Sequence, residues 1–325
     1  MLLLTGATGF LGHHLVSHLQ AAGHALRALV RPGSDTAFLE KRGVELAWAG
    51  DIGDRPALRE ACRDCDAVVH AAGHFRMWGN LCHFWQTNVG GTDAVMEAAL
   101  YEGVQRLVYV STAVVVGRTE PGRLVDESHP CRPQDHYQRT KLEAERLALA
   151  YQRNCGVGVV VVRPGALYGP WGRYAFNRLF FEDPWRGWRI KIHGGRRITF
   201  PAYAPDVARG IAAALERGRS GQIYNLAGPS LSHNEVNDVI SDLAGISRWR
   251  LSMPAGPLLL LAWLWTVASR YTSREPFYPR NLAHYVFQDW QVCSAKAQTE
   301  LGFKTTPFRR GARETLEWYR QQGIL

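Results

Sequence analysis

The sequence predicts an α/β protein with a doubly wound parallel sheet and a smaller, mostly helical C-terminal lobe. Six apolar runs of strand length occur near the start of the chain, separated by stretches of helical periodicity. The runs are continuously apolar rather than alternating, which indicates strands buried on both faces, as in a parallel sheet covered by helices. Regular alternation of such strands with helices is typical of doubly wound folds. In chain order the runs read LLLTG, LRALV, VELAW, DAVVH, RLVYVST and GVVVVRPG.

After Pro164 this rhythm stops, and the chain becomes rich in aromatic, glycine and arginine residues. A helix at about 206–217 and a strand in QIYNLAG then return to the sheet, and the remainder is mostly helical and aromatic. The second lobe is therefore expected to be discontinuous. We predict a sheet domain of 1–165 plus about 206–227, and a substrate lobe of about 166–205 plus 228–325.

Composition indicates a globular protein. The 325 residues are 46% hydrophobic and 21% charged, with a mean hydropathy of −0.20. The net charge of +9 attracts acidic ligands and anionic surfaces, but no run of five basic residues occurs, so we expect no nucleic-acid binding. Six cysteines are too few for a disulfide scaffold, and the Cys62/Cys65 pair has no second pair to complete a metal site. We expect a cytoplasmic protein without a metal.

One segment bears on membranes. Residues 251–269 read LSMPAGPLLLLAWLWTVAS and carry no charge, but Pro254, Gly256 and Pro257 leave too short an apolar stretch for a span of about 20 residues. We expect a buried or interfacial helix, with packing inside the lobe as the alternative to a peripheral membrane contact. We expect no signal peptide either, because the three leading leucines run directly into a glycine-rich turn.

That turn, TGATGFLG, lies between the first strand and an amphipathic helix. Gly6 permits a tight turn, Gly9 lets backbone amides approach a pyrophosphate, and Gly12 lets the helix pack closely on the strand. The helix N-terminus offers free N–H groups and the positive end of its dipole to the phosphates. The pattern predicts a dinucleotide-binding (Rossmann) domain.

The end of the second strand indicates which dinucleotide binds. NAD-type domains place an acidic residue there, whereas this chain has Arg31, with Ser34 nearby. A guanidinium suits a 2′-phosphate, so NADP(H) is favoured over NAD(H), although Arg31 can instead stack on the adenine. Asp51 and Ile52, just past the third strand, are placed to meet the adenine, or else are a turn aspartate and a core isoleucine.

Two residues farther along the chain carry the chemistry. Tyr137 and Lys141 are one helical turn apart, so their side chains share one face of a helix. An ammonium near a phenol lowers the phenol pKa and makes it a usable acid or base. A hydroxyl at the end of the fifth strand, Ser111 or Thr112, can hold the substrate oxygen.

At these residues the chain resembles an extended short-chain dehydrogenase/reductase of the NAD-dependent epimerase/dehydratase superfamily. The resemblance covers nearly the whole chain, including the glycine pattern, GDIGD, VVHAAG, NVGGT, VSTAVVVG, RPGALYGP and PAYAPDVARG. It implies that Tyr137 is the acid/base, that Lys141 lowers the pKa of Tyr137 and grips the nicotinamide ribose, and that Thr112, five residues before Gly117, holds the substrate oxygen. Val116 departs from the tyrosine that many nucleotide-sugar members have there.

The resemblance also assigns further cofactor contacts along the chain, with Arg163 beside Pro164 and Leu167 near the nicotinamide. Together with the residues above, the expected cofactor-binding set is Gly6, Thr8, Gly9, Phe10, Leu11, Gly12, Arg31, Ser34, Asp51, Ile52, Ala71, Ala72, Gly73, Asn88, Ser111, Tyr137, Lys141, Pro164 and Leu167.

Within that family the chain is most similar to the branch of 3β-hydroxysteroid dehydrogenases, 3-oxo-lipid reductases and dihydroflavonol reductases, on segments such as AAGHFRMWGN. The aromatic second lobe suits a hydrophobic ligand. Its arginines, on the other hand, keep open a phosphate-bearing substrate. The expected substrate residues are His74, Trp78, Trp171 and Tyr203.

We therefore expect an NADP(H)-dependent oxidoreductase that interconverts a ketone and a secondary alcohol on a lipid- or steroid-like substrate. A nucleotide-sugar epimerase or dehydratase is the first alternative. A non-catalytic NADP-sensing protein is the second, although the chain retains Thr112, Tyr137 and Lys141. A homodimer and a peripheral membrane contact through 251–269 are both compatible with these expectations.

Overall fold

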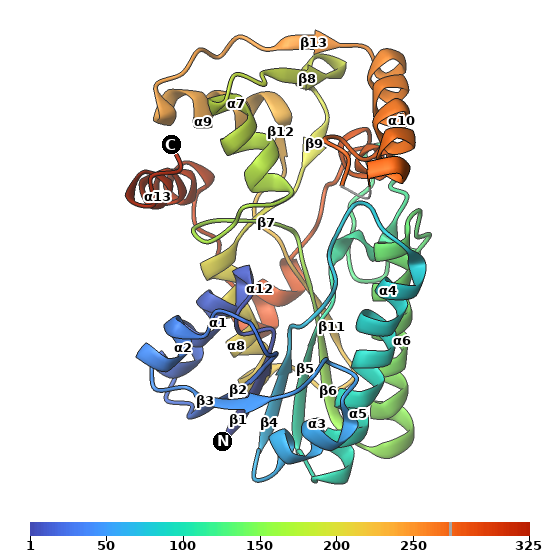
Figure 1. Ribbon diagram of the computed structural model, residues 1–325, viewed down its shortest axis with the longest axis vertical. Coiled ribbons are helices and arrows are strands. Elements are labelled where there is room, and N and C mark those ends of the chain that lie inside the picture. The colour runs from blue at the N-terminus through green and yellow to red at the C-terminus, as the bar shows by residue number, and fades with distance from the viewer. Residues whose placement is uncertain (273–274) are drawn as a thin grey trace.

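The computed structural model describes residues 1–272 and 275–325. Its centre is a seven-stranded parallel sheet, as the continuous apolar runs predict, with the spatial order β11-β6-β5-β4-β1-β2-β3 (Figure 1). The order reverses between β1 and β4, which is where ligands bind in open α/β sheets. The strands are β1 (Leu2–Thr5), β2 (Leu26–Val30), β3 (Glu45–Trp48), β4 (Ala67–His70), β5 (Arg106–Val110), β6 (Gly158–Pro164) and β11 (Ile223–Leu226).

Helices cover both faces of this sheet because both faces are apolar. One core lies under α1 (Phe10–Ala21), α2 (Ala37–Lys41) and α8 (Ala204–Arg217), and the other under α3 (Arg55–Cys62), α5 (Gly91–Tyr101) and α6 (His136–Cys155). The short helix α4 (Leu81–Trp85) and a π-helical turn at Gln86–Gly90 lead into α5, and a 3₁₀ turn at Ala113–Val116 follows β5.

The second lobe lies beyond the carboxyl ends of the strands (Figure 1). Its strands form three separate pairs, and its helices enclose an aromatic core that includes Phe176, Phe181 and Phe308. The strand pairs are β7 (Ala166–Tyr168) with β10 (Pro201–Tyr203), β9 (Ile198–Thr199) with β12 (Leu231–Ser232), and β8 (Ile190–Ile192) with β13 (Leu251–Met253). The helical elements are Arg178–Glu182 (π-helical), α7 (Asp183–Trp185), His193–Gly195 (3₁₀), α9 (His233–Ala244), α10 (Ala255–Thr272), Arg280–Leu282 (3₁₀), α11 (Ala283–Val286) and α13 (Phe308–Gln321).

One C-terminal helix lies with the sheet rather than with the second lobe. Helix α12 (Ala295–Leu301) packs on α8 and β11, and its Ala297 and Leu301 are buried in the same core as α1. The sequence boundary at 228–325 placed this segment in the second lobe, because its short apolar pattern does not say which surface it covers.

The uncharged segment 251–269 forms strand β13 and most of helix α10, on the outside of the second lobe (Figure 1). No helix in the described part of the chain is long and apolar enough to cross a membrane.

Candidate active site

The glycine turn lies between β1 and α1, and each of its glycines has a different geometry. Gly6 has a φ of +78°, and a Cβ there would lie 2.8 Å from the backbone of Ala71. A Cβ on Gly12 would lie 2.3 Å from the carbonyl oxygen of Gly6, so α1 could not pack where it does. A Cβ on Gly9 would meet only the Gly6 carbonyl, at 3.3 Å, because its outer side is open. Gly9 caps α1, so this open space faces a helix N-terminus.

The other expected adenosine contacts lie at the neighbouring strand ends. Arg31 directly follows β2 and is exposed, and its carbonyl accepts a bond from the Ser34 amide at 3.1 Å, which closes a turn. Asp51 accepts a bond from the Gly53 amide at 2.6 Å, and Ile52 packs against Gly91 of α5. The local roles considered for Asp51 and Ile52 are therefore present, while their contact with an adenine stays a prediction.

Three side chains meet at the carboxyl end of β5. Thr112 caps the 3₁₀ turn after that strand, while Tyr137 and Lys141 lie in the first two turns of α6. The Lys141 Nζ donates to the Val110 carbonyl at 2.7 Å and lies 4.3 Å from the centre of the Tyr109 ring. The Tyr137 phenol interacts with the Thr112 hydroxyl. The structure thus brings together the three residues expected to carry the chemistry.

Burial controls the electrostatics of these residues. It lowers the pKa of Lys141 to about 7, and the Glu145 carboxylate raises that pKa only in part. Burial raises the pKa of Tyr137, a hydrogen bond with Thr112 lowers it, and Asp135 raises it. The sequence predicted a lowered tyrosine pKa. That expectation is corrected here, because desolvation of the phenolate is the largest effect in this structure.

Asn88 joins three segments around this centre. It lies in the π-helical turn, and its side chain accepts from the His74 amide at 2.7 Å and donates to the His74 carbonyl at 3.2 Å. Its Nδ2 also reaches the Thr140 Oγ1 at 3.0 Å. Gly73 lies against it, since a Cβ there would be 3.3 Å from the Asn88 oxygen. Asn88 therefore fixes the loop after β4 to helix α6.

Phe75, which the sequence analysis passed over, covers the tyrosine. Its ring centre lies 4.6 Å from that of Tyr137 and 5.5 Å from that of Tyr174. The Tyr174 hydroxyl accepts from the Met77 amide at 3.1 Å and donates to Glu275, so residues of both lobes meet here. The only available signal was the position of Phe75 just after a strand end, which does not say where its ring points.

Comparison with known protein families agrees with this geometry. The model of the NAD dependent epimerase/dehydratase family matches residues 2–227. The chain belongs to this family. Within it, the relatives and structural neighbours identify an extended short-chain dehydrogenase/reductase, an oxidoreductase that acts on CH–OH groups with a nicotinamide dinucleotide.

Members with different substrates are similar to this chain. Sterol demethylase protein B of Methylococcus capsulatus is 29% identical, with 99% of each chain covered. A 4-hydroxy-2-methyl-3-oxo-4-farnesyl-3,4-dihydroquinoline-1-oxide ketoreductase of Stigmatella aurantiaca is 35% identical over 69% of this chain and 66% of that protein. The solved structure of the dTDP-glucose 4,6-dehydratase DesIV from Streptomyces venezuelae, with NAD bound, is 26% identical with a TM-score of 0.80 over 100% of both chains.

The residues present fit a dinucleotide of this family. The open side of Gly9 accommodates phosphates at the N-terminus of α1, beside Thr8, Phe10 and Leu11. The buried Ser111 Oγ, next to Thr112, has no hydrogen-bond partner within the described chain. An unsatisfied buried hydroxyl is costly without a partner, which a bound ligand can supply.

The remaining members of the expected cofactor set line the strand ends. The Ala72 amide donates to Thr5 Oγ1 at 3.2 Å, Pro164 ends β6, and Leu167 lies in β7. Arg163 differs from the rest, because its guanidinium is buried and paired with Glu145 at 2.5 Å. This ion pair holds β6 against α6.

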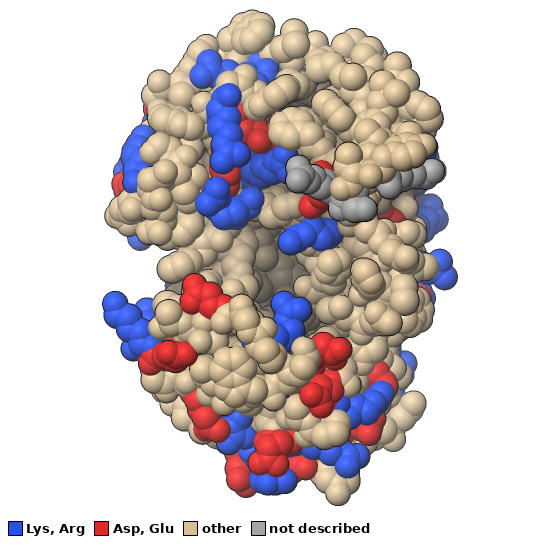
Figure 2. Space-filling model, viewed as in Figure 1, with Lys and Arg blue, Asp and Glu red and all other residues tan. Residues whose placement is uncertain are grey.

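The four expected substrate residues lie in different places. His74 and Trp78 are half-buried on the loop that carries Phe75, and burial lowers the pKa of His74. Trp171 stacks on His13 of α1, with their ring centres 4.0 Å apart. Figure 2 shows a hollow between the two lobes. Tyr203 is 6% exposed in the aromatic core of the second lobe and donates to Glu314. Substrate contact by these residues stays a prediction, and the burial of Tyr203 gives it a packing role.

Proposed function

We propose that this enzyme is an NADP(H)-dependent oxidoreductase that interconverts a ketone and a secondary alcohol on a hydrophobic, lipid- or steroid-like substrate. The observation that carries the proposal is the meeting of Thr112, Tyr137 and Lys141 under the aromatic ring of Phe75. Bound NADPH would supply a hydride to the carbonyl carbon and leave as NADP⁺. The proton needed to complete the alcohol must come from the protein.

Tyr137 is the group placed to provide that proton. The phenol is protonated at neutral pH, so it holds the proton that a ketone oxygen needs. Burial raises its pKa and makes it a weaker acid, which a positive charge beside it would offset. Thr112 supports the same oxygen through its hydroxyl. Lys141, half protonated near neutral pH in the cofactor-free protein, would be held in its charged form by the nicotinamide ribose hydroxyls and return a proton to Tyr137.

Arg31 supports NADP(H) over NAD(H). It is exposed at the end of β2 and forms none of the ion pairs found among the described residues. A free guanidinium suits a 2′-phosphate, whereas an acidic residue would bind the ribose hydroxyls of NAD.

The arginines of the second lobe favour a hydrophobic substrate. Of the six arginines at positions 173–197, four already have carboxylate partners in the protein. A paired guanidinium has less to offer a phosphate. The four pairs are Arg173–Glu182, Arg178–Asp183, Arg186–Glu182 and Arg197–Asp289.

A nucleotide-sugar dehydratase or epimerase is the second candidate, supported by the similarity to dTDP-glucose 4,6-dehydratases. Such an enzyme would use its dinucleotide without net consumption. The two candidates therefore differ in whether the dinucleotide is consumed during turnover, which can be observed directly.

The test is a screen for NADPH oxidation, followed at the nicotinamide absorbance, over 3-oxo lipids, oxosteroids and aromatic ketones, with nucleotide-sugars as the counter-screen. Steady NADPH consumption with a hydrophobic ketone, lost in Tyr137→Phe, is the expected result. Turnover of a nucleotide-sugar with no net absorbance change would establish the second candidate instead. If Tyr137→Phe keeps the biological activity and Gly9→Trp abolishes it, the protein is an NADP sensor and not a reductase.

A further inference from the structure

Helix α10 (Ala255–Thr272) turns several of its large apolar side chains away from the protein. Its inward positions hold small residues, with Ala262 only 5% and Ser269 only 3% exposed. Its outward positions hold Leu260 at 58%, and Trp263 and Leu264 at 48% each. Soluble helices normally bury the apolar stripe and expose the polar one. This arrangement leaves leucine and tryptophan side chains of α10 exposed at the surface of the molecule.

The outward residues recur at helical spacing and extend to a neighbouring edge. We call Leu260, Leu261, Trp263 and Leu264 the α10 face; Leu260 is three and four residues from Trp263 and Leu264, and Leu261 is three residues from Leu264. Trp188, Trp249 and Leu251, at 49%, 66% and 49% exposed, lie on or beside the pair of β8 and β13 that precedes the helix. Contiguous exposed apolar surface of this kind marks an interaction site.

The charge around the α10 face selects the partner. The cavity that α10 helps to line carries Lys191 and Arg280 and, among the described residues, no carboxylate, and the net charge of the molecule is +9. Tryptophan, leucine and flanking basic residues are the composition of helices that lie in the boundary region of a bilayer and bind anionic lipids.

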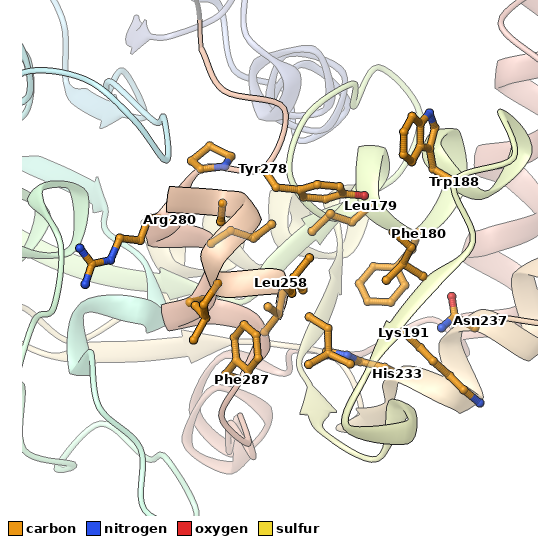
Figure 3. A pocket seen from close by; sticks show the side chains of 18 residues that line it. Leu179, Phe180, Trp188, Lys191, His233, Asn237, Leu258, Tyr278, Arg280 and Phe287 are labelled. Carbon is orange, nitrogen blue, oxygen red and sulfur yellow. The ribbon is translucent and has the colours of Figure 1, made fainter. Parts of the chain in front are cut away.

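A cavity lies directly under this helix. Leu258, Leu259 and Ala262 of α10 form one wall, and Phe180, Ile192 and Phe287 contribute to the others. Figure 3 shows Lys191 and Arg280 extending away from the apolar middle of this cavity. Helix α10 thus also forms one wall of an apolar cavity in the second lobe.

We propose that the α10 face docks on an anionic membrane surface, with the leucines and tryptophans inserted among the lipid headgroups. The cavity beneath α10 then lies next to the bilayer and is suited to the hydrocarbon end of a lipid. The docking itself rests on the exposed face and its charge, and it does not depend on the reaction proposed above.

The test is co-sedimentation of the full-length protein with vesicles. One set is phosphatidylcholine alone, and the other is phosphatidylcholine and phosphatidylglycerol in equal parts. We expect binding to the anionic vesicles that weakens at high salt. The double variant Leu260→Glu, Leu264→Glu should bind at least about tenfold more weakly. Each change removes a leucine that the bilayer would bury and adds a negative charge.

Leu124→Glu is the matched control, since Leu124 is 59% exposed but belongs to the segment before α6 and not to α10, and should leave vesicle binding unchanged. Circular dichroism and the rate with a water-soluble ketone, both unaffected in the double variant, separate lost docking from lost folding or lost chemistry. Equal binding by the double variant and the wild type would overturn the proposal. So would a wild-type dimer in light scattering that the same variant dissociates, because a second copy would then cover the face.

Discussion

At the residue scale, the proposed choice of NADP(H) depends on one side chain, that of Arg31. It follows β2, is exposed, and projects from a turn closed by the Ser34 amide. Backbone atoms close this turn, which leaves the guanidinium available to the 2′-phosphate of the proposed cofactor.

We predict that Arg31→Asp exchanges the preference for NADPH for one for NADH. A hydrogen bond to a charged group contributes about 1.5–3 kcal/mol, so its loss should raise the KM for NADPH roughly tenfold to a hundredfold. The aspartate would instead accept bonds from the ribose hydroxyls of NADH. Initial rates with both cofactors measure the change, and Arg42→Asp, an exposed arginine after α2, is the control. An unchanged ratio of the two rates would remove Arg31 from the cofactor site.

The burial of Lys141 predicts a pH dependence of the free energy of unfolding. Burial holds its pKa at about 7 in the folded protein, while a lysine in an unfolded chain has a pKa of about 10.4. Between these values the unfolded chain binds more protons than the folded one. The contribution of Lys141 to the free energy of unfolding must therefore rise with pH above about 7.

We predict that the free energy of unfolding of the cofactor-free wild type, minus that of Lys141→Met, grows as the pH rises from 7 toward 9. The slope can reach about 1.4 kcal/mol per pH unit and should vanish well below pH 7, where both states are protonated. Urea unfolding at several pH values gives this difference. A difference that stays flat over the range would show that the lysine is not desolvated.

At the scale of elements, α6 carries both Tyr137 and Lys141, and several contacts hold this helix in place. The Asp135 side chain caps it by accepting from the Gln138 amide at 2.8 Å, and Glu145 binds Arg163 of β6. The π-helical turn before α5 supplies Asn88, which reaches Thr140 on the same helix. The position of the phenol thus depends on three neighbouring elements.

We predict that Asn88→Ala lowers both stability and kcat. It leaves the His74 amide and carbonyl without this partner, at about 1–3 kcal/mol for each unsatisfied group, while the Thr140 hydroxyl keeps its bond to the His136 carbonyl. It also releases the loop that holds Phe75 over Tyr137. Asn80→Ala is the control, because it removes an exposed helix cap worth about 1 kcal/mol that is formed with the Cys82 amide and not with α6. Urea unfolding and steady-state rates should separate them: both variants lose stability, but only Asn88→Ala loses kcat. Equal kcat values would leave Asn88 a purely structural residue.

At the scale of the whole molecule, the two lobes meet around the glycine turn. Trp171 of the second lobe stacks on His13, and His14 Nε2 lies 3.0 Å from the Pro170 carbonyl. Gly172 also packs against Phe10, the first residue of α1. A ligand at the N-terminus of α1 would therefore contact the region where the lobes join and should stabilise the whole molecule.

We predict that NADPH at a hundredfold excess over its Kd adds about 2.7 kcal/mol to the free energy of unfolding. Gly9→Trp should abolish this gain, because the indole would fill the open side of the turn. Gly256→Trp is the control, since a Cβ there meets no described atom within 4 Å and the site lies elsewhere. Thermal shift measurements with and without NADPH provide the comparison. An equal shift in the Gly9 variant would place the dinucleotide somewhere else.

The sequence by itself determined the parallel sheet, the glycine turn and the pairing of Tyr137 with Lys141. Each of these is a local pattern: apolar runs, glycine spacing, or two residues one helical turn apart. Local patterns carry their own geometry, so they were readable without neighbours. The class of substrate is not set by such a local pattern, so the sequence by itself did not determine it.

Only the tertiary structure decided the features that depend on distant neighbours. Burial by other elements raised the pKa of Tyr137 where the sequence predicted the reverse, because desolvation depends on everything packed around a group. Phe75 lies over the phenol and α12 packs on the sheet through contacts between segments far apart in the chain. The outward face of α10 has the same origin, since its apolar run is equally compatible with a buried helix until the rest of the lobe leaves that face uncovered.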